Sequence, residues 1–226
     1  MTQPGRTVRS SLELDRPVLE VRELHKSFRK RLSIHPRVNH VLRGVTFSLP
    51  RASMVGLVGE NGSGKSVLMK IIVGLMTADS GTVEVGGRLG YCPQAPLLYD
   101  KLTCEETFRL FGHAYGLRDE ETEARAVELL ELLGFGRFRH ELVENLSGGT
   151  AQKLNLSVAL LHKPELLLLD EPYSGFDWET YLKFWDLAAS LREQGTTILI
   201  VSHFIEERSR FDKIVQLRDG AVAEDA

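Results

Sequence analysis

A glycine-rich segment at residues 59–66 has the composition of a phosphate-binding loop. The segment reads GENGSGKS, follows an apolar run and precedes a helical pattern, which is the context that a G-x-x-x-x-G-K-[ST] match requires. Backbone N–H groups in such a loop turn towards phosphate oxygens, Lys65 adds a positive charge at the β- and γ-phosphates, and the Ser66 hydroxyl can bind Mg²⁺. The predicted contacts of ATP are Gly59, Glu60, Asn61, Gly62, Ser63, Gly64, Lys65, Ser66 and Val67.

Two carboxylates follow the apolar run at residues 166–169. We expect this run to form a buried strand, which would place Asp170 and Glu171 at its carboxyl end, where open α/β sheets bind ligands. Asp170 would then bind Mg²⁺, and Glu171 would polarise an attacking water as a general base. A lone acidic pair after a strand is usually a solvated turn or a helix cap, but its combination with the Lys65 motif predicts nucleotide hydrolysis.

A second candidate phosphate site is made of Ser147, Gly148 and Gly149, which open a helical run and offer an anion a hydroxyl and free N–H donors. With Leu146 before them and Thr150 after them, they resemble the signature motif of ABC ATPases. The resemblance implies that this loop meets the γ-phosphate held by an opposite subunit, so that a head-to-tail pair encloses two nucleotides. The partner would be a second copy of the chain or a related ATPase subunit. Thr150 departs from the glutamine that the family usually has, which concerns turnover and not the fold.

Four further residues match the motifs of the family one by one. Gln94, in the segment YCPQ, resembles the Q-loop glutamine that touches Mg²⁺ and the attacking water. Phe28 occupies the place of the residue that stacks on adenine, Asp177 resembles the D-loop aspartate, and His203 resembles the switch histidine. The resemblance implies three groups: catalytic Glu171, His203 and Gln94; nucleotide contacts at Phe28, Ser147, Gly148, Gly149 and Asp177; and metal ligands Ser66, Gln94 and Asp170. The long segment after Phe28 leaves other candidates for the adenine contact, namely Arg22, Arg29 and His35.

Strand candidates alternate with helical patterns from residue 54 onward, which predicts a mostly parallel sheet covered by helices. The expected strands are residues 18–21, 41–49, 54–58, 166–169, 198–201 and 214–217. A polar, basic segment separates the first two, and we interpret it as a solvated loop, with a contact to anionic lipid or to the nucleotide as the alternative. Together with the resemblance, the pattern predicts an α/β fold: a P-loop NTPase core with a mostly parallel sheet, an N-terminal antiparallel β subdomain and an inserted helical subdomain.

A helical insertion is expected between residues 103 and 133, where the strand signal vanishes. Apolar residues there have helical spacing, Gly134 is placed to end the helix, and Asp119 is a candidate N-cap. A later helix at about 179–191 carries an aromatic stripe that we interpret as core packing. The predicted organisation is a flexible leader at residues 1–17, a single domain at 18–220 with the helical subdomain at about 97–146, and a tail at 221–226.

The overall composition limits the class of protein. With 226 residues, 42% hydrophobic and 26% charged, the chain is average for a soluble globular domain. Its net charge of -3 lacks the basic footprint of a nucleic-acid binder, so no nucleic acid is expected as a partner. Cys92 and Cys104 have no metal-ligand spacing, which fits a reducing cytoplasm. No apolar run approaches the roughly 18 residues needed to span a bilayer, so any membrane role would come through a partner.

Three functions compete: a transporter motor, a soluble ABC ATPase of DNA repair or metal-cluster assembly, and a P-loop enzyme acting on a small molecule. The last would not need the second phosphate site at Ser147. DNA-repair relatives carry long heptad arms between the two motifs, whereas the interval from Lys65 to Ser147 has no sustained heptads. Residues 102–117 and 159–164 resemble exporter ATPases with separately encoded membrane subunits. The favoured prediction is a cytoplasmic ATPase on the inner face of the cell membrane that drives export through an integral membrane permease.

Overall fold

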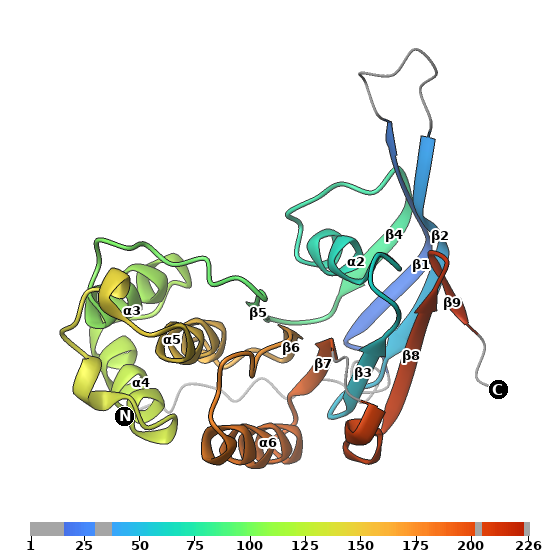
Figure 1. Cartoon of the computed structure of the whole chain (residues 1–226). Helices are drawn as coiled ribbons and strands as arrows, with labels where there is room; N and C mark the ends of the chain where they lie inside the picture. Colours follow the sequence, from blue (N-terminus) through green and yellow to red (C-terminus); the bar gives the residue numbers. More distant parts are fainter. Residues whose placement is uncertain (1–15, 30–37, 202–204, 224–226) are drawn as a thin grey trace, which may run out of the picture.

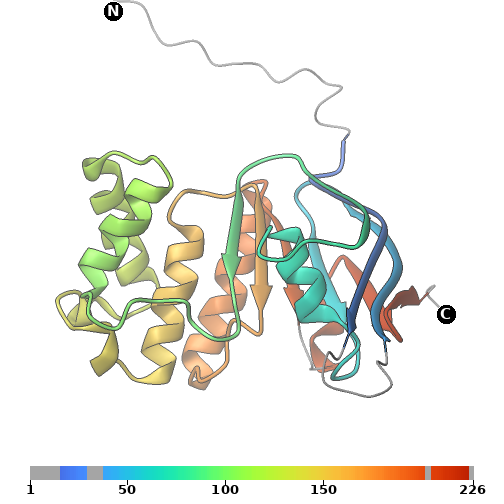
Figure 2. The same ribbon diagram turned by 90° about the horizontal axis from the view of Figure 1, so that it is seen from above.

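The structure of the chain, a computed structural model, describes residues 16–29, 38–201 and 205–223. Two lobes are visible in Figure 1. One holds the strands and helix α2 (Lys65–Ile72), and the other holds helices α3 (Cys104–Ala114) and α4 (Asp119–Leu132). Helices α5 (Gly148–Leu160) and α6 (Trp178–Glu193) lie between the helical lobe and the sheet (Figure 2). Within the described ranges, no helix has the length and apolarity needed to cross a lipid bilayer.

The central sheet confirms the predicted P-loop NTPase core. It has six strands in the order β5-β6-β7-β3-β8-β9, and only β8 and β9 are antiparallel. In sheet order the strands are β5 (Leu89–Cys92), β6 (Leu166–Asp170), β7 (Thr197–Val201), β3 (Met54–Val58), β8 (Lys213–Arg218) and β9 (Ala221–Ala223). Residues 221–223 therefore form an edge strand and not the start of a tail. The reason is the turn at Asp219 and Gly220, which both have positive φ and return the chain along β8.

The three central strands of this sheet, β6, β7 and β3, are buried on both faces, which explains their continuous apolar runs. In β6, Leu167 and Leu169 join the hydrophobic cluster that contains α5 and α6 residues, whereas Leu166 and Leu168 join the cluster that contains α2 residues. Successive side chains of a strand point to opposite faces, so a strand covered on both sides is apolar throughout. The aromatic stripe of α6 is core packing as predicted, because Phe184, Trp185 and Ala188 are buried there.

The N-terminal antiparallel subdomain is a three-stranded sheet in the order β2-β1-β4. Its strands are β1 (Leu19–Arg29), β2 (Val38–Leu49) and β4 (Ser80–Val85). The hairpin of β1 and β2 is longer than the strands expected at residues 18–21 and 41–49, so both ends of the basic segment that we interpreted as a loop are strand. One face of this hairpin is exposed, so its outer residues are polar and weaken the apolar signal used for the prediction.

The helical insertion contains two helices, α3 and α4. Gly134 ends α4 with φ 67°, as predicted, and the N–H of Phe135 reaches back to the Leu130 carbonyl at 3.0 Å. The predicted N-cap Asp119 is wrong by one position, since the cap is Arg118. The Glu121 carboxylate accepts the Arg118 backbone N–H at 3.2 Å and its guanidinium at 2.9 Å, and this contact lowers the pKa of Glu121 to about 2. Short 3-10 turns complete the described chain: Gly136–Phe138, Val143–Asn145 and Ile205–Arg210.

Strand β5 lies so close to α5 that Gly90 must lack a side chain. A Cβ at this position would overlap the Ala159 carbonyl oxygen and would lie 2.9 Å from Cγ of Pro164. We expect Gly90→Ala to lower the free energy of unfolding by about 1–3 kcal/mol, because overpacking forces backbone shifts. Chemical denaturation would measure the loss. The matched control is Gly136→Ala, where a new Cβ meets nothing within 4 Å, and a loss as large in that variant would contradict the explanation.

Candidate functional site

The predicted phosphate loop connects β3 to α2 and ends at the first turn of that helix. Gly64 precedes α2 with φ 106°, a left-handed conformation that favours glycine. A Cβ there would also lie 2.8 Å from Cδ2 of Leu42 and 3.0 Å from the Val41 carbonyl oxygen. The loop therefore wraps against β2 and directs the free N–H groups of the helix N-terminus into the space above the sheet, as an anion site requires.

Lys65 is the charged residue of this loop and is almost fully buried, with 6% of its surface exposed. Its Nζ donates to the carbonyl oxygens of Gly59 at 2.7 Å and Glu60 at 3.0 Å, so the ammonium lies inside the loop. Burial lowers the pKa of Lys65, and the nearby Asp170 and Glu171 carboxylates act in the opposite direction. The side chain is thus a preorganised cation beside the helix N-terminus, a combination that attracts phosphate oxygens.

One cavity of about 370 Å³ brings most of the predicted site together at the carboxyl ends of the parallel strands. Val41 and Val201 supply apolar wall, and the predicted site residues along it are Asn61, Gly62, Gly64, Lys65, Ser66, Val67, Gln94, Asp170 and Glu171. These residues come from segments that are more than a hundred positions apart in the chain. The arrangement places a cation, a hydroxyl, an amide and two carboxylates around one space large enough for the phosphates of a nucleotide.

The two carboxylates have different surroundings. Asp170 is the last residue of β6 and is 5% exposed, whereas Glu171 lies beyond the strand at φ 49°, which is unusual for a residue with a side chain. The Glu171 N–H donates to the Val201 carbonyl at 3.3 Å, and Gln94 Nε2 donates to Glu171 Oε2 at 2.9 Å. A positive φ at a residue with a side chain is strained and persists only where the surrounding structure stabilises it. At Glu171 this conformation turns the carboxylate towards Gln94.

The donor set around this cavity fits Mg²⁺ held jointly by protein and phosphate. Ser66, Gln94 and Asp170 all line the cavity and all carry oxygen, the ligand that Mg²⁺ prefers. Among the residues that the structure describes, no cluster of three or more His, Cys, Asp or Glu side chains could hold a metal by itself. Mg²⁺ usually binds through one or two carboxylates plus substrate phosphates and water, which agrees with this incomplete protein set.

The second predicted phosphate site lies apart from this cavity. Ser147 is the N-cap of α5, and its hydroxyl accepts the Thr150 N–H at 3.3 Å and bonds the Thr150 hydroxyl at 2.9 Å. Ser147 and Gly148 are exposed, and neither lines the cavity of the phosphate loop. Gly149 lies against the loop before α6, where an added Cβ would be 2.5 Å from the Gly175 carbonyl oxygen. The two predicted phosphate sites therefore lie at two separate helix N-termini, those of α2 and α5.

Asp177 and the predicted adenine contact also lie outside the cavity. Asp177 caps α6 by accepting the Thr180 N–H at 2.8 Å. Phe28 is near the end of β1 and is 41% exposed, with the Lys26 ammonium 5.6 Å from its ring centre. His203 and His35 fall outside the described residues, and the Arg22 guanidinium is held by Glu20 at 2.6 Å.

A second cavity adjoins the phosphate loop and was missed by the sequence analysis. It measures about 630 Å³ and lies between residues 59–63 of the loop, the strands β2 and β8, and the turn at Asp219 and Gly220. Polar residues from two strands and one turn meet there, namely Asn39, His40, Arg43, Arg218 and Asp219. No motif joins them, because they come together only through the antiparallel returns of the chain, such as the bond from the Arg43 N–H to the Gly220 carbonyl at 2.7 Å.

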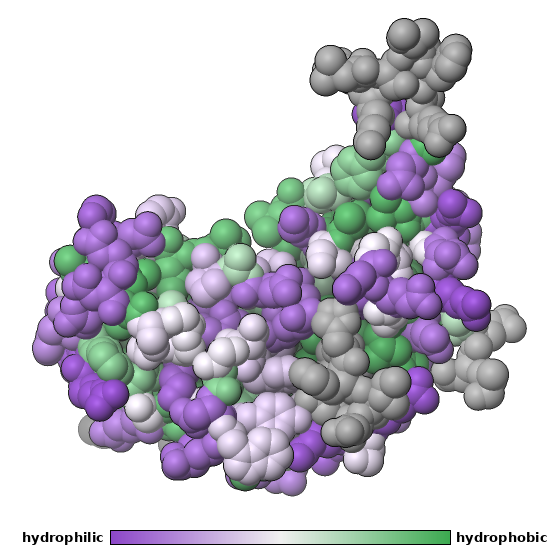
Figure 3. Space-filling model, in the orientation of Figure 1, coloured by the Kyte–Doolittle hydropathy of each residue, from purple (hydrophilic) through white to green (hydrophobic). Residues whose placement is uncertain are grey.

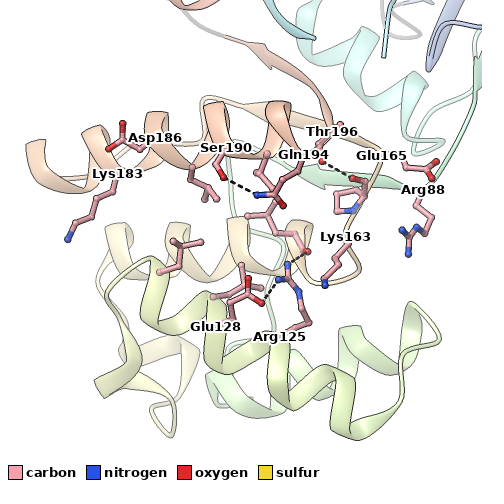
Figure 4. Close-up of a pocket in the computed structure, with 17 residues that line it drawn as sticks. Arg88, Arg125, Glu128, Lys163, Glu165, Lys183, Asp186, Ser190, Gln194 and Thr196 are labelled. Atoms are coloured by element: carbon pink, nitrogen blue, oxygen red, sulfur yellow. Dashed lines mark hydrogen bonds and ion pairs between the residues drawn. The ribbon is translucent and has the colours of Figure 1, made fainter. Parts of the chain in front are cut away.

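A third cavity, of about 760 Å³, contains none of the predicted site residues. Figure 4 shows it between α4 and α6, with the Arg125–Glu128 ion pair on one side and the Ser190–Gln194 hydrogen bond on the other. Arg88 and Thr196, which precede β5 and β7, also line it. It therefore lies at the amino ends of the parallel strands, the edge opposite to the phosphate loop.

Comparisons with known proteins agree with this geometry. Residues 42–174 match the family model described as ABC transporter. The chain is 37% identical over 179 residues to the linearmycin resistance ATP-binding protein LnrL of Bacillus subtilis, covering 74% of this chain and 58% of that protein. It is 33% identical to the Nod factor export ATP-binding protein I of Burkholderia lata, covering 80% of this chain and 64% of that protein. The chain thus spans less than two thirds of the length of each of these relatives.

A solved structure resembles the whole described fold. It is described as the dimeric post-hydrolysis state of the ATP-binding cassette MJ0796 bound to ADP and phosphate, and it covers 92% of this chain and 97% of its own, with 25% identity and a TM-score of 0.83. The family model spans more than half of the chain and includes both the phosphate loop and the carboxylate pair. From the site geometry and these matches, we conclude that the chain belongs to the ABC transporter family.

Proposed function

We propose that this chain is the ATP-hydrolysing motor of a membrane exporter and that it works by ATP-dependent pairing of two ATPase subunits. The observation that carries the proposal is the single cavity in which Lys65, Ser66, Asp170 and Glu171 converge, with Gln94 bonded to Glu171 at 2.9 Å. Within the proposal, one ATPase domain begins at residue 18 and includes the edge strand β9 beyond residue 220, and its helical subdomain spans about 97–146.

The proposed chemistry divides the roles among these side chains. Lys65 and the loop N–H groups bind the β- and γ-phosphates, and Glu171 accepts a proton from the attacking water, which Gln94 helps to orient. Ser66, Asp170 and the Gln94 amide oxygen are the residues that would hold Mg²⁺. When bound, Mg²⁺ neutralises charge on the phosphate oxygens. Phe28 would stack on the adenine ring, because an aromatic face is exposed at the end of β1.

The separation of the two anion sites supports a paired arrangement. Ser147 and Gly148 are exposed at a helix N-terminus but lie outside the Lys65 cavity of their own chain. In a head-to-tail pair, these residues of one copy would close the cavity of the other, with Asp177 near the same boundary. The dimeric cassette to which this chain is similar favours a second copy or a related subunit as the partner.

Export rather than import is favoured by the relatives, whose names include a resistance protein and an export protein. A permease partner is supported by apolar residues that the chain leaves exposed after β5, where Leu97 and Tyr99 are 61% and 60% exposed. Figure 3 shows apolar atoms along the hollow between the two lobes. A chain that docks there on a membrane protein would reside at the inner face of the cell membrane.

A mixing experiment tests the shared site. We expect Lys65→Ala and Ser147→Arg proteins each to be inactive alone, since one lacks the phosphate cation and the other blocks the second anion site. Mixed in equal amounts, they should regain roughly a quarter of the wild-type hydrolysis rate, because half of randomly formed pairs are mixed and each contains one intact site. Phosphate release measures the recovery.

The control places both substitutions in one chain. In a head-to-tail pair with wild type, one site contains the altered phosphate loop and the other contains the altered second anion site, so both are inactive. Addition of the double variant should therefore lower the wild-type rate. If the separate variants stay inactive on mixing and the double variant leaves the wild-type rate unchanged, the shared site is contradicted.

A further inference from the structure

Asn155 is a buried polar residue on α5 that contacts the segment leading to Gln94. It is 4% exposed, and its Nδ2 donates to the Pro93 carbonyl oxygen at 2.9 Å and to the Cys92 Sγ at 3.2 Å. Gln152, one turn earlier on α5 and 2% exposed, donates to the same sulfur at 3.7 Å. The Pro93 carbonyl can only accept a hydrogen bond, so the amide of Asn155 must turn its nitrogen towards it. The opposite orientation would bring the Asn155 oxygen against the Pro93 oxygen.

The same helix is attached to β5 at two further points. His162, just after α5, bonds the Leu89 carbonyl at 3.0 Å, and Gly90 packs directly under the Ala159 carbonyl. Together with the Asn155 bond, these contacts follow β5 from its first residue to its end. Helix α5 and strand β5 therefore form one rigid unit, which begins at Ser147 and ends at the segment before Gln94.

The hydrogen bond from Asn155 to the Pro93 carbonyl lies directly before Gln94 in the chain. Pro93 has a fixed φ and no N–H, so its carbonyl is the hydrogen-bonding group nearest to Gln94 on that side. Holding this carbonyl sets the direction in which the chain leaves β5, and the next side chain, Gln94, reaches Glu171 Oε2 at 2.9 Å. Burying a polar group in an apolar layer costs free energy unless the group is hydrogen-bonded. An apolar side chain at position 155 would be sufficient for packing alone.

We propose that Asn155 is a positioning residue for hydrolysis: through the Pro93 carbonyl it holds Gln94 against Glu171 and ties that contact to α5. This inference rests on the proposed hydrolysis by Glu171. Because α5 starts at Ser147 and Gly148, a displacement of the helix when its N-terminus meets an anion would move Gln94 with it. The second anion site would thereby influence the orientation of the attacking water.

The test is a double-mutant cycle between Asn155 and Gln94 that follows ATP binding and turnover separately. We expect Asn155→Ala to lower kcat about tenfold, the worth of one hydrogen bond that aligns the site, while the Kd for ATP changes less than about twofold. In a Gln94→Ala protein, adding Asn155→Ala should cause no further loss of kcat, because residues that act through one another are not additive. The matched control is Ser157→Ala, whose hydroxyl is also buried on α5 but bonds only the Lys153 carbonyl at 2.8 Å.

Two outcomes overturn the inference: an Asn155→Ala kcat equal to that of Ser157→Ala, or full additivity with Gln94→Ala. If Asn155→Ala does not fold, Asn155→Leu, which keeps the branched shape of the side chain but has no donor, replaces it in the cycle. The proposed function is checked apart from this, because Lys65→Ala and Glu171→Gln must lose turnover whether or not Asn155 matters.

Discussion

Replacing Glu171 by glutamine should reduce phosphate release by about 10² to 10⁴, the usual contribution of a general base. The change keeps the size of the side chain and removes its basic charge. Lys65, Ser66 and Asp170 are untouched in the same cavity, so ATP should still bind. Unhydrolysed ATP should then hold two subunits together, and gel filtration with Mg-ATP should show a dimer.

Asp170→Asn is the matched comparison, because it makes the same chemical change one residue earlier. Asp170 is buried at the end of β6 and is assigned to the metal, so its loss should weaken Mg²⁺-dependent binding and give little dimer and little turnover. The two variants are therefore expected to fail differently in gel filtration and alike in phosphate release. A Glu171→Gln protein that hydrolyses ATP at the wild-type rate would falsify the assignment.

Lys65→Ala should reduce turnover by about 10² to 10³. This is the loss expected when a preorganised positive charge is removed from the place where negative charge develops in the transition state. The structure places Nζ inside the loop, bonded to the Gly59 and Glu60 carbonyls, so the substitution removes both the cation and an internal brace. ATP affinity should fall as well, which equilibrium dialysis with labelled ATP would measure.

The control for this variant is Lys70→Ala, which removes a lysine from the last turn of the same helix, at an exposed position. General loss of positive charge near the loop would affect both variants. If Lys70→Ala lost as much affinity as Lys65→Ala, the effect would come from net charge and not from the position of Lys65 in the loop.

The central strands of the sheet could be predicted from the sequence because β3, β6 and β7 are covered on both faces and are therefore apolar throughout. The expected strands at 54–58, 166–169, 198–201 and 214–217 are confirmed, and their limits agree within one residue with β3, β6, β7 and β8. The β1–β2 hairpin was underestimated because half of its surface is solvated. Strands β4, β5 and β9 were missed. Strands β5 and β9 have only four and three residues and carry little periodicity, and the residues of β4 are all exposed or half-buried, so they form no apolar run.

The candidate site could be predicted where a single local motif defines it. Residues 59–66 and the pair Asp170 and Glu171 each form a motif of consecutive positions. The structure brings residues 61, 62 and 64–66 of the loop and both carboxylates to one cavity. Pairings between distant segments carry no such signal. The bond from Asn155 to the Pro93 carbonyl spans 62 positions of sequence, and it exists because α5 crosses over β5.

The burial of Cys92 under α5 also determines how the protein responds to thiol chemistry. Burial and the Asp170 charge raise the pKa of the Cys92 thiol, and burial raises that of Cys104 to about 11. The thiolate is the form that reacts with oxidants and alkylating agents, so at neutral pH both residues are inert while the chain stays folded. These are the only two cysteines of the sequence. Oxidants and alkylating agents should therefore leave both thiols of the folded protein unmodified, and no reductant is needed to keep them reduced.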